Sequence, residues 1–580
     1  MTTVANRADS SEAAVQERIA QLEHDFGDLD DPGNPMGAEQ FLAADERGRL
    51  LPAAERLLDG FGLNAEFVPR ELGGRLDRID ALSRVLRAVF RRDAALGLGY
   101  GLNSYMASVI IWADGTPDQR RDTAELLLGG GRMACAYPEP AQGNDFLANR
   151  LSARPDGDGY LLSGRKEALN GVASAQSLLL FAHTPGAGEG ELSAFLMPGP
   201  DSPAGANLGL TPRRRTVGIR GCAVQGLEFD GHHVTREMLV GAAGAGARLA
   251  ERAFPLTRST GLSMALGCAD TALRTTTAFA RSHRSRSRAS LHTARTRTAL
   301  VDAFTDLLIC DCVSLVATRS VHLLPGESRT LGAVAKYLLP TVLNEAIYDL
   351  SIVLGAESYA RTGSYGIFQK AARDLPMIGL GSAGTAASRA VIIAQLLWLP
   401  ELPASCGAEA PAALFRPFDA DLPPYRREEL VPAPEGDALL ASLAHSARYA
   451  SVVSGPLGEA LAEAAAALTE QLRGLLDSCA ALTDHPAGRP VSPRAYAMAD
   501  RYALIAAGAA CLGVWRHQRG TGGFLADPAW VAMALTRIAG RLDQSAARPL
   551  PLGEERLLTE LLHRFDDARS YDLYATAIGS

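Results

Sequence analysis

The stretch SLLLFAHT (177–184) is one of four short apolar runs that decide the fold class of this 580-residue chain. The others read GYLLSG (159–164), LSAFLMP (192–198) and GLEFDG (226–231). Gly, Pro, Asp and Asn separate the runs, which is typical of short strands joined by turns. We therefore predict a small β-barrel or sandwich over residues 133–240.

The segments on both sides of this β unit have a helical pattern. Residues 38–132 and 241–399 keep apolar residues at three- and four-residue spacing. Residues 1–37 form a polar N-terminal segment, 400–437 a proline-rich linker, and 438–580 an additional Ala/Leu-rich helical domain. The predicted fold class is α+β, mainly α, and a ligand is expected where the two helical units and the β unit meet.

Composition narrows the possible functions. A net charge of −8 argues against a nucleic-acid binder, and eight cysteines without a histidine cluster argue against a metal site. Reduced cysteines and an N-terminus without an apolar h-region favour a cytoplasmic protein. The longest apolar runs, 390–399 and 502–515, are shorter than a bilayer of about 30 Å requires, so we expect buried helices and no membrane span.

The positive charge is almost entirely arginine. Lys166, Lys336 and Lys370 are the only lysines in the chain. We attribute this skew to genome composition and draw no chemistry from it. The arginine-rich stretch 280–297 could be read alone as a nucleic-acid patch, but the acidic chain and the lack of interleaved aromatic residues favour other roles.

The stretch PMIGLGSAGT (376–385) contains a literal G-x-G-x-x-G. A dinucleotide-binding loop needs a buried strand immediately before it, and here only Met377 and Ile378 separate the loop from Pro376. Proline cannot donate to a sheet ladder, and the lysine of a P-loop is absent. We expect this stretch to be a turn with another role.

Several motifs along the chain match those of one protein family and occur in the same order. MACAYPEPAQGND (133–145) resembles the flavin-contacting motif of acyl-CoA dehydrogenases, and GDGYLLSGRKEALNG (157–171) resembles the strand and turn that follow it. Further matches include the pieces VGIRGCAVQGLEFDGHHVTREMLVG, AVAKYL, LGAESYA and RDLPMI, in the same order as in that family. The resemblance covers roughly residues 40–395, and the tail after 437 resembles an extra helical domain that some large members carry.

The resemblance implies FAD, bound between the β domain and the C-terminal bundle, often across a subunit interface, in a homodimer or homotetramer. An arginine in the 280–297 stretch would grip the FAD pyrophosphate, and Arg284 is our choice, because a guanidinium fork suits a diphosphate. A proline replaces the usual threonine of the flavin motif, and KEALNG lacks the usual Trp and Thr, so the surroundings of the flavin ring must differ from the standard ones. The expected FAD-binding residues are Tyr137, Pro138, Gly143, Asn144, Ala168, Leu169, Arg284, Gly355, Ala356 and Thr385.

The family's catalytic glutamate is missing. Counting from the Arg-Asp pair of the bundle places Ser382 at its position, and aligning on the following Gly-Thr places Ala383 there. A second location used by some members corresponds here to Thr257, just before an arginine. Glu251, nearly two turns upstream, is a weak candidate for a relocated base, since a base must first be correctly placed.

Three hypotheses follow from the lost carboxylate and the kept flavin motifs. The chain could decarboxylate a peptidyl or acyl β-keto acid, desaturate it and use O2 to form an epoxyketone, as a natural-product branch of this family does. It could instead dehydrogenate an acyl thioester, bound to CoA or to an acyl or peptidyl carrier protein, with a relocated base. It could also be a catalytically dead subunit that pairs with an active homologue.

Overall fold

The computed structural model describes most of the chain. Described are residues 11–579, except for 138, 140, 142–147, 188–190, 206–207, 286–287, 382–383, 401–408, 431–435, 482–491, 544 and 546–547.

The N-terminal part is a helical domain. Its helices are α2 (Glu12–Phe26), α3 (Ala38–Glu46), α4 (Pro52–Phe61), α5 (Ile79–Arg92), α6 (Ala94–Leu96), α7 (Asn103–Asp114) and α8 (Pro117–Leu128). Helix α8 begins at a reciprocal capping box between Thr116 and Gln119. The segment predicted as polar contains α2, which buries Val15, Ile19 and Phe26 against the domain.

The central domain is a single eight-stranded sheet with the order β6-β7-β3-β2-β4-β5-β8, in which β1 pairs with β4. A sheet domain at this place confirms the prediction of a central β unit between two helical parts of the chain. Its long strands β3 and β7 pair antiparallel, whereas β1 runs parallel to β4. The strands are β1 (Met133–Ala136), β2 (Ser152–Asp156), β3 (Gly159–Leu169), β4 (Ser177–His183), β5 (Leu192–Pro198), β6 (Gly209–Leu210), β7 (Gln225–Thr235) and β8 (Leu239–Val240).

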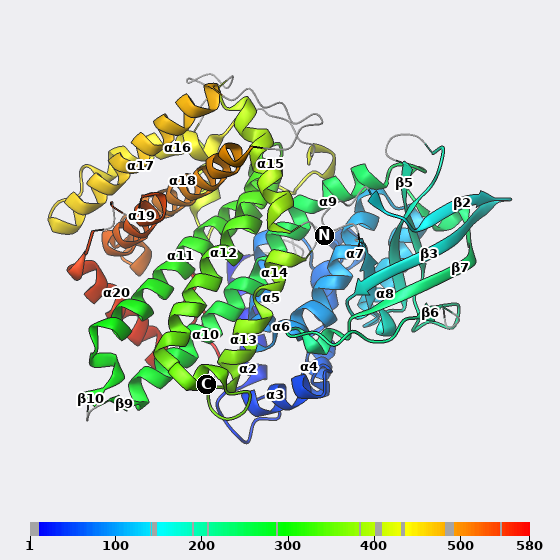
Figure 1. The fold of residues 1–580 in the computed structure, drawn as a ribbon, viewed down its shortest axis with the longest axis horizontal. Helices are drawn as coiled ribbons and strands as arrows, with labels where there is room; N and C mark the ends of the chain where they lie inside the picture. Colours follow the sequence, from blue (N-terminus) through cyan, green and yellow to red (C-terminus); the bar gives the residue numbers. More distant parts are fainter. Residues whose placement is uncertain are drawn as a thin grey trace, which may run out of the picture.

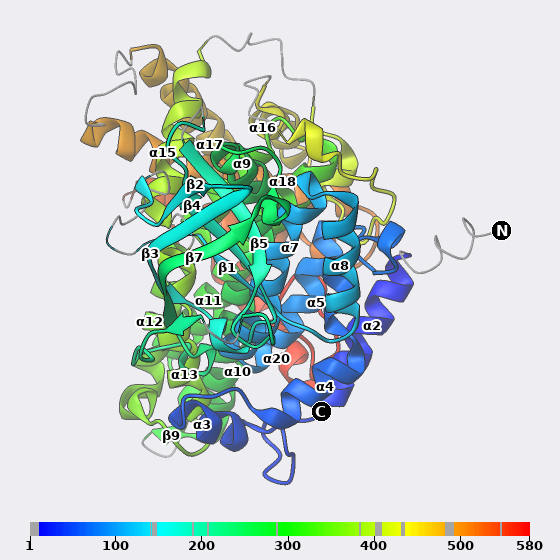
Figure 2. The same cartoon turned by 90° about the vertical axis from the view of Figure 1, so that its right-hand side faces the viewer.

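Long helices form a bundle beside the sheet domain (Figure 1). Helices α10, α11 and α12 pack against one another, and α5 of the N-terminal domain packs against α10. Viewed from the side of the sheet, the strands lie in front of this bundle (Figure 2). The bundle comprises α9 (Gly246–Gly261), α10 (Ser263–Ser282), α11 (Ala294–Leu323), α12 (Ser328–Leu354), α13 (Gly366–Asp374), α14 (Met377–Leu380) and α15 (Thr385–Trp398), with the β9–β10 hairpin after α10.

Extra C-terminal helices cover the face of the bundle that lies away from the sheet domain (Figure 1). Helix α18 contacts α11 and α15, and α20 contacts α11. These helices confirm the extra helical domain. They are α16 (Ala438–Ala450), α17 (Pro456–Ala480), α18 (Pro493–Gln518), α19 (Pro528–Leu542) and α20 (Pro551–Asp566).

The expectation that no apolar segment reaches the length of a membrane span is wrong on length. Within the described residues, 94–114, 328–359 and 493–518 are helical segments long and apolar enough to cross a bilayer. The sequence estimate counted only uninterrupted apolar runs, whereas these helices include scattered polar residues. Their most apolar windows are 89%, 50% and 78% buried inside the protein, so much of this apolar surface packs within the fold.

Candidate functional site

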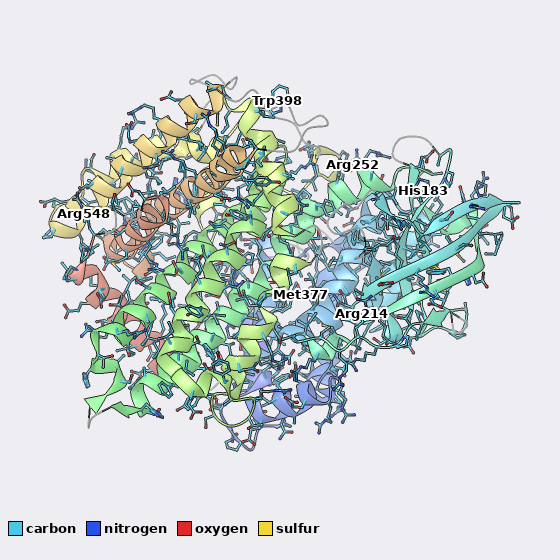
Figure 3. The ribbon with its side chains drawn as sticks, viewed as in Figure 1. His183, Arg214, Arg252, Met377, Trp398 and Arg548 are labelled. Atoms are coloured by element: carbon cyan, nitrogen blue, oxygen red, sulfur yellow. The ribbon has the colours of Figure 1, made fainter. Side chains whose placement is uncertain are left out.

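A cavity of about 130 Å³ lies between the sheet domain and the helical bundle. Met377, labelled in Figure 3, lies on the side of the bundle that faces the sheet. Elements from all three predicted units contribute to the wall, as the sequence led us to expect. The lining residues are Leu98, Leu102, Asn103, Met106, Cys135, Tyr137, Ala168, Leu169, Asn170, Thr257, Arg258, Gly261, Met264, Lys336, Met377, Ile378 and Gly381.

One wall comes from an irregular turn of helix. The backbone over Gly97–Leu102 is a π-helix that continues into α7, and it carries Leu98 and Leu102 into the cavity. A π-turn is rarely the most stable form of a helix and is frequent at functional sites. It here supplies an apolar wall opposite the end of strand β3.

The sheet side of the cavity is formed where β1 and β3 end. Tyr137 follows β1, and Ala168 and Leu169 are the last residues of β3. Ala168 has a φ of 60°, a left-handed conformation that is costly for a residue with a Cβ and that tends to occur at functional sites. The side-chain amide of Asn103 donates to the carbonyl of Asn170 at 3.1 Å, which holds the end of β3 against α7.

A buried ion pair supports the segment after β1. The Glu139 carboxylate accepts hydrogen bonds from the backbone N–H groups of Arg150 and Leu151 at 2.8 and 2.9 Å and lies 3.2 Å from the Lys166 ammonium. Lys166 also donates to the Tyr137 carbonyl at 3.4 Å. Burial lowers the pKa of Lys166 to about 8. This lysine therefore ties Tyr137 and Glu139 to strand β3.

Two buried basic side chains face the cavity from the bundle. Arg258 on α9 is 6% exposed and Lys336 on α12 is 7% exposed. Burial, and then the charge of Arg258, lower the pKa of Lys336 to about 7. Burial, followed by the charge of Arg329, lowers the pKa of Arg258 to about 10. The cavity thus contains an amine that changes charge near neutral pH beside a second cation.

No ion pair with a carboxylate is recorded for either group in the part of the chain that the structure describes, although the charge of Glu251 partly offsets the effect of burial at Arg258. Arg258 lies over the Phe254 ring, 4.5 Å from its centre, and its buried Nε has no hydrogen-bond partner among the described residues. No described aspartate or glutamate side chain lines the cavity. Buried charges are normally paired. The cavity is therefore suited to an anionic ligand.

The residues considered for the missing base lie in two places. Ser382 and Ala383 fall outside the described residues. They follow in sequence directly after Gly381, which lines the cavity. Glu251 lies on the exposed face of α9, with its side chain 51% exposed and 3.8 Å from Arg329. It is not part of the cavity lining.

The expected FAD-binding residues are spread more widely than the cavity. Tyr137, Ala168 and Leu169 line it, whereas Pro138, Gly143 and Asn144 fall outside the described residues. The backbone of Arg284 is in β9 (Arg284–Ser285), which pairs with β10 (Arg288–Ala289) at the far end of α10 in Figure 1. Gly355 and Ala356 are exposed in the turn after α12, and Thr385 is the first residue of α15. None of these last four lines the cavity of a single chain.

The glycine-rich stretch connects helices. Met377–Leu380 is the short helix α14, and α15 begins at Thr385. Helix α13 and not a strand precedes Gly379, so the stretch lacks the buried strand that a dinucleotide-binding loop requires. Among the described residues, no group of three or more His, Cys, Asp and Glu side chains is placed to hold a metal ion.

Sequence reasoning missed Lys336, although a signal was present. All three lysines of the chain are buried, and Lys370 lies among the carboxylates of Asp93 and Asp374 at 3.1 and 2.6 Å. In a chain that uses arginine almost everywhere else, a retained lysine marks a place where a compact or titratable cation is needed. The attribution of the skew to genome composition stays a prediction, but the positions of the three lysines were a signal for buried sites.

The chain matches known proteins over the same region. Residues 134–232 match the model of the acyl-CoA dehydrogenase middle domain, and 244–397 match that of the C-terminal domain. The mitochondrial short-chain specific acyl-CoA dehydrogenase of Homo sapiens is 31% identical over 232 residues, which are 39% of this chain and 55% of that protein. The chain thus spans about half the length of that curated relative.

Solved structures share the fold. An acyl-CoA dehydrogenase from Bacillus anthracis, complexed with FAD, aligns over 96% of this chain and 95% of its own, with a TM-score of 0.67 and 17% identity. The prolyl acyl carrier protein oxidase AnaB covers 66% of this chain and 98% of its own, with a TM-score of 0.58 and 19% identity. Members of the matched family bind FAD. Residues 134–232 and 244–397 thus match the middle and C-terminal domains of the acyl-CoA dehydrogenase family, and the chain has an acyl-CoA dehydrogenase-like fold.

Proposed function

We propose that this protein is an FAD-dependent oxidoreductase that acts on a β-keto acid, free or carried as a peptidyl or acyl unit, and converts it to an epoxyketone. The observation that carries the proposal is the buried pair of Arg258 and Lys336 in a cavity without a described carboxylate. A substrate carboxylate is the counter-charge that this pair lacks.

Two features of the cavity wall support this cofactor and this reaction. Its apolar wall of Leu98, Leu102 and Leu169 suits a flat ring, and the peptide groups at the end of β3 can meet the polar edge of that ring. FAD, when bound, accepts a hydride and, once reduced, passes electrons to O2 for the oxygenation. The chain's own residues bind the acid, stabilise the charge that develops on it and exclude water.

Arg258 and Lys336 have separate tasks in this proposal. The Arg258 guanidinium holds the substrate carboxylate as an ion pair. The Lys336 ammonium donates to the keto oxygen, so that when the carbon–carbon bond to CO2 breaks, the electron pair is stabilised as an enolate. No proton has to be removed from carbon, so a glutamate base is unnecessary. An entering anion also raises the pKa of Lys336 and keeps it charged.

The pKa of Lys336 supports one alternative as well. A neutral amine with a pKa of about 7 could itself remove the α-proton of an acyl thioester and replace the glutamate. The two functions require opposite protonation states. In the first, kcat/KM falls as the pH rises above about 7, because the ammonium is needed. In the second, kcat/KM rises through the same range, because the amine is needed.

The test is anaerobic flavin reduction by the purified FAD-bound protein across pH 6–9. Bleaching by a β-keto acid with release of CO2, strongest at low pH, and oxygen uptake on admission of air support the proposal. Bleaching by an acyl-CoA alone, strongest at high pH, would replace it with thioester dehydrogenation. A colourless protein that takes up no FAD would leave the dead-subunit hypothesis.

A further inference from the structure

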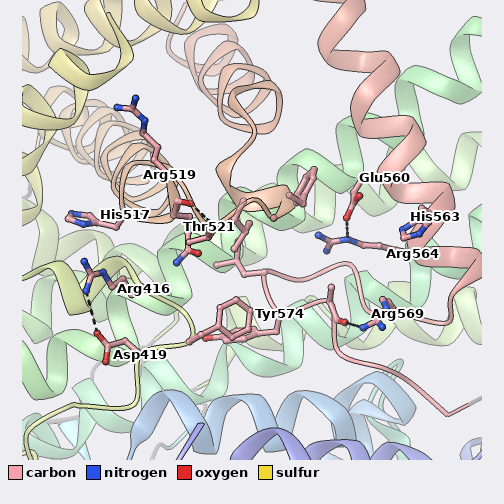
Figure 4. A pocket seen from close by; sticks show the side chains of 17 residues that line it. Arg416, Asp419, His517, Arg519, Thr521, Glu560, His563, Arg564, Arg569 and Tyr574 are labelled. Atoms are coloured by element: carbon pink, nitrogen blue, oxygen red, sulfur yellow. Dashed lines mark hydrogen bonds and ion pairs between the residues drawn. The ribbon is translucent and has the colours of Figure 1, made fainter. Parts of the chain in front are cut away.

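A second and larger cavity, of about 1020 Å³, lies in the C-terminal helical domain. It is formed by the linker, the end of α18, helix α20 and the chain's tail, and it shares no lining residue with the cavity described above (Figure 4). Its lining residues are Arg416, Phe418, Asp419, His517, Gln518, Arg519, Thr521, Gly523, Phe524, Leu525, Glu560, His563, Arg564, Arg569, Leu573, Tyr574 and Ala575.

Three arginines from separate segments line this cavity, and two of them, Arg519 and Arg569, have no ion pair with a carboxylate recorded among the described residues. Arg519 contacts only aromatic faces in the pairs that the structure records, with its guanidinium 5.5 Å from the centre of the Trp515 ring. Arg569 donates to the Ala575 carbonyl at 3.1 Å, and Arg416 lies 4.0 Å from Asp419. These arginines come from α18, the tail and the linker, so three separate segments bring positive charge to one cavity.

The acidic residues of the cavity are already engaged. Glu560 accepts from Arg564 at 2.7 Å, and Arg564 is buried beneath the cavity, where it also donates to the Asp572 carbonyl at 2.7 Å. Asp419 is the acid that faces Arg416. With Glu560 neutralised by Arg564, and Asp419 by Arg416, two positive charges remain on Arg519 and Arg569.

The cavity also has an aromatic wall. Phe418 is 41% exposed, although it is a large apolar side chain, and its ring meets that of Tyr574 edge-on at 5.6 Å. Leu525 and Leu573 extend the apolar surface. The Nε2 atom of His517 is buried and has no hydrogen-bond partner among the described residues, while its ring stacks on Phe415. An exposed ring beside free guanidinium groups matches a ligand with a flat part and an anionic part.

We propose that this cavity is a binding site for an organic phosphate that carries a flat ring, the chemistry of a nucleotide. A guanidinium fork binds two phosphate oxygens, so Arg519 and Arg569, which lie on opposite sides of the cavity in Figure 4, are two alternative places for the phosphate. Phe418 and Tyr574 receive the ring. The volume is that of a typical small-molecule site, which makes a complete nucleotide a suitable size. The site is independent of the oxidation proposed for the other cavity.

The experiment is calorimetric titration of the full FAD-loaded protein with ADP, with adenosine and with inorganic phosphate, which separates the contributions of ring and phosphate. ADP is expected to bind, and at least one of Arg519→Ala and Arg569→Ala is expected to raise its Kd at least tenfold. Phe418→Ala is expected to raise it at least threefold. Arg473→Ala is the matched control, because Arg473 is an exposed arginine on α17 that pairs with Glu470 outside the cavity. The Kd of this variant for ADP should stay within twofold of the wild-type value.

Several results would overturn the assignment. No detectable binding of ADP at millimolar concentration excludes a nucleotide site. An unchanged Kd in both cavity variants, or an equal loss in Arg473→Ala, places any binding elsewhere, including the flavin-side cavity. If adenosine binds as tightly as ADP, the phosphate is not recognised. If inorganic phosphate binds as tightly as ADP, the ring is not recognised. Melting curves of each variant verify that the fold is intact.

Discussion

Two buried clusters of positive charge in this protein are built in opposite ways. On α5, Arg87 donates to Asp311 and Asp572, and Arg91 pairs with Glu23 and Asp270. In the cavity between the sheet and the bundle, Arg258 and Lys336 have no acidic partner in the described chain. Burial by itself would lower the pKa of both Arg87 and Lys336. At Arg87 the nearby carboxylates outweigh burial, so the pKa of Arg87 is raised, whereas the pKa of Lys336 falls to about 7.

The difference separates structural charges from functional ones. The acids that pair with α5 come from α2, α10, α11 and the C-terminal tail, so the cluster fastens together segments that are distant in sequence. Arg258 and Lys336 do not link distant segments through ion pairs. Their burial costs free energy, because no ion pair with a carboxylate among the described residues offsets the desolvation of the charges. A costly arrangement of this kind is expected where a ligand provides the missing charge.

The largest expected effect tests the functional side of this comparison. Lys336→Met should lower kcat/KM for the oxidised substrate at least 100-fold, because the group that stabilises developing charge is gone. Lys336→Arg keeps a cation and should recover part of the loss for a β-keto acid, though not for a thioester that needs a base. Stopped-flow flavin bleaching measures both variants. Full activity of Lys336→Met would assign this lysine to packing.

The second effect is on stability and has the opposite sign. The pKa of Lys336 is about 7 in the folded protein and 10.5 in the unfolded chain, so the unfolded state binds more protons between these values. The cost to the folded state is complete below pH 7 and disappears as the pH rises to about 10.5. Lys336→Met should therefore stabilise the protein by about 5 kcal/mol at pH 6 and by little at pH 10.5. Urea unfolding at constant FAD measures the difference, and a pH-independent difference would contradict it.

The third effect tests the cluster in which the arginines of α5 are paired with carboxylates. Asp572→Asn removes a carboxylate shared by two buried arginines and should destabilise the protein by about 3 kcal/mol. Asp567→Asn is the control, since this exposed residue directly follows α20 and its recorded ion pair among the described residues is with His563. The substitution should cost less than about 0.5 kcal/mol. Chemical unfolding compares the two variants. Equal effects would show that the tail is not fastened by this pair.

The same contrast explains what the sequence could predict. The apolar run SLLLFAHT and the helical spacing on both sides of the sheet domain depend on neighbours along the chain. The mainly helical fold with a central sheet domain could therefore be predicted, and the ordered motifs pointed to FAD. The cavity instead joins Arg258 and Lys336, which are 78 positions apart in sequence, and their lowered pKa values depend on burial that no local pattern reports. The partnership of Asp572 with α5 was hidden for the same reason.

The smallest effect sharpens the comparison at the backbone. Ala168 at the cavity and Ala568 before the tail both have left-handed backbone, with φ values of 60° and 48°. Glycine relieves this strain at either place but adds freedom to the unfolded chain, so each substitution should change stability by less than about 1 kcal/mol. Only Ala168 places a methyl group in the cavity wall. Ala168→Gly should therefore lower kcat/KM about threefold through looser substrate placement, while Ala568→Gly leaves it unchanged. Identical kinetics of the two variants would indicate that the strain at Ala168 serves the strand turn alone.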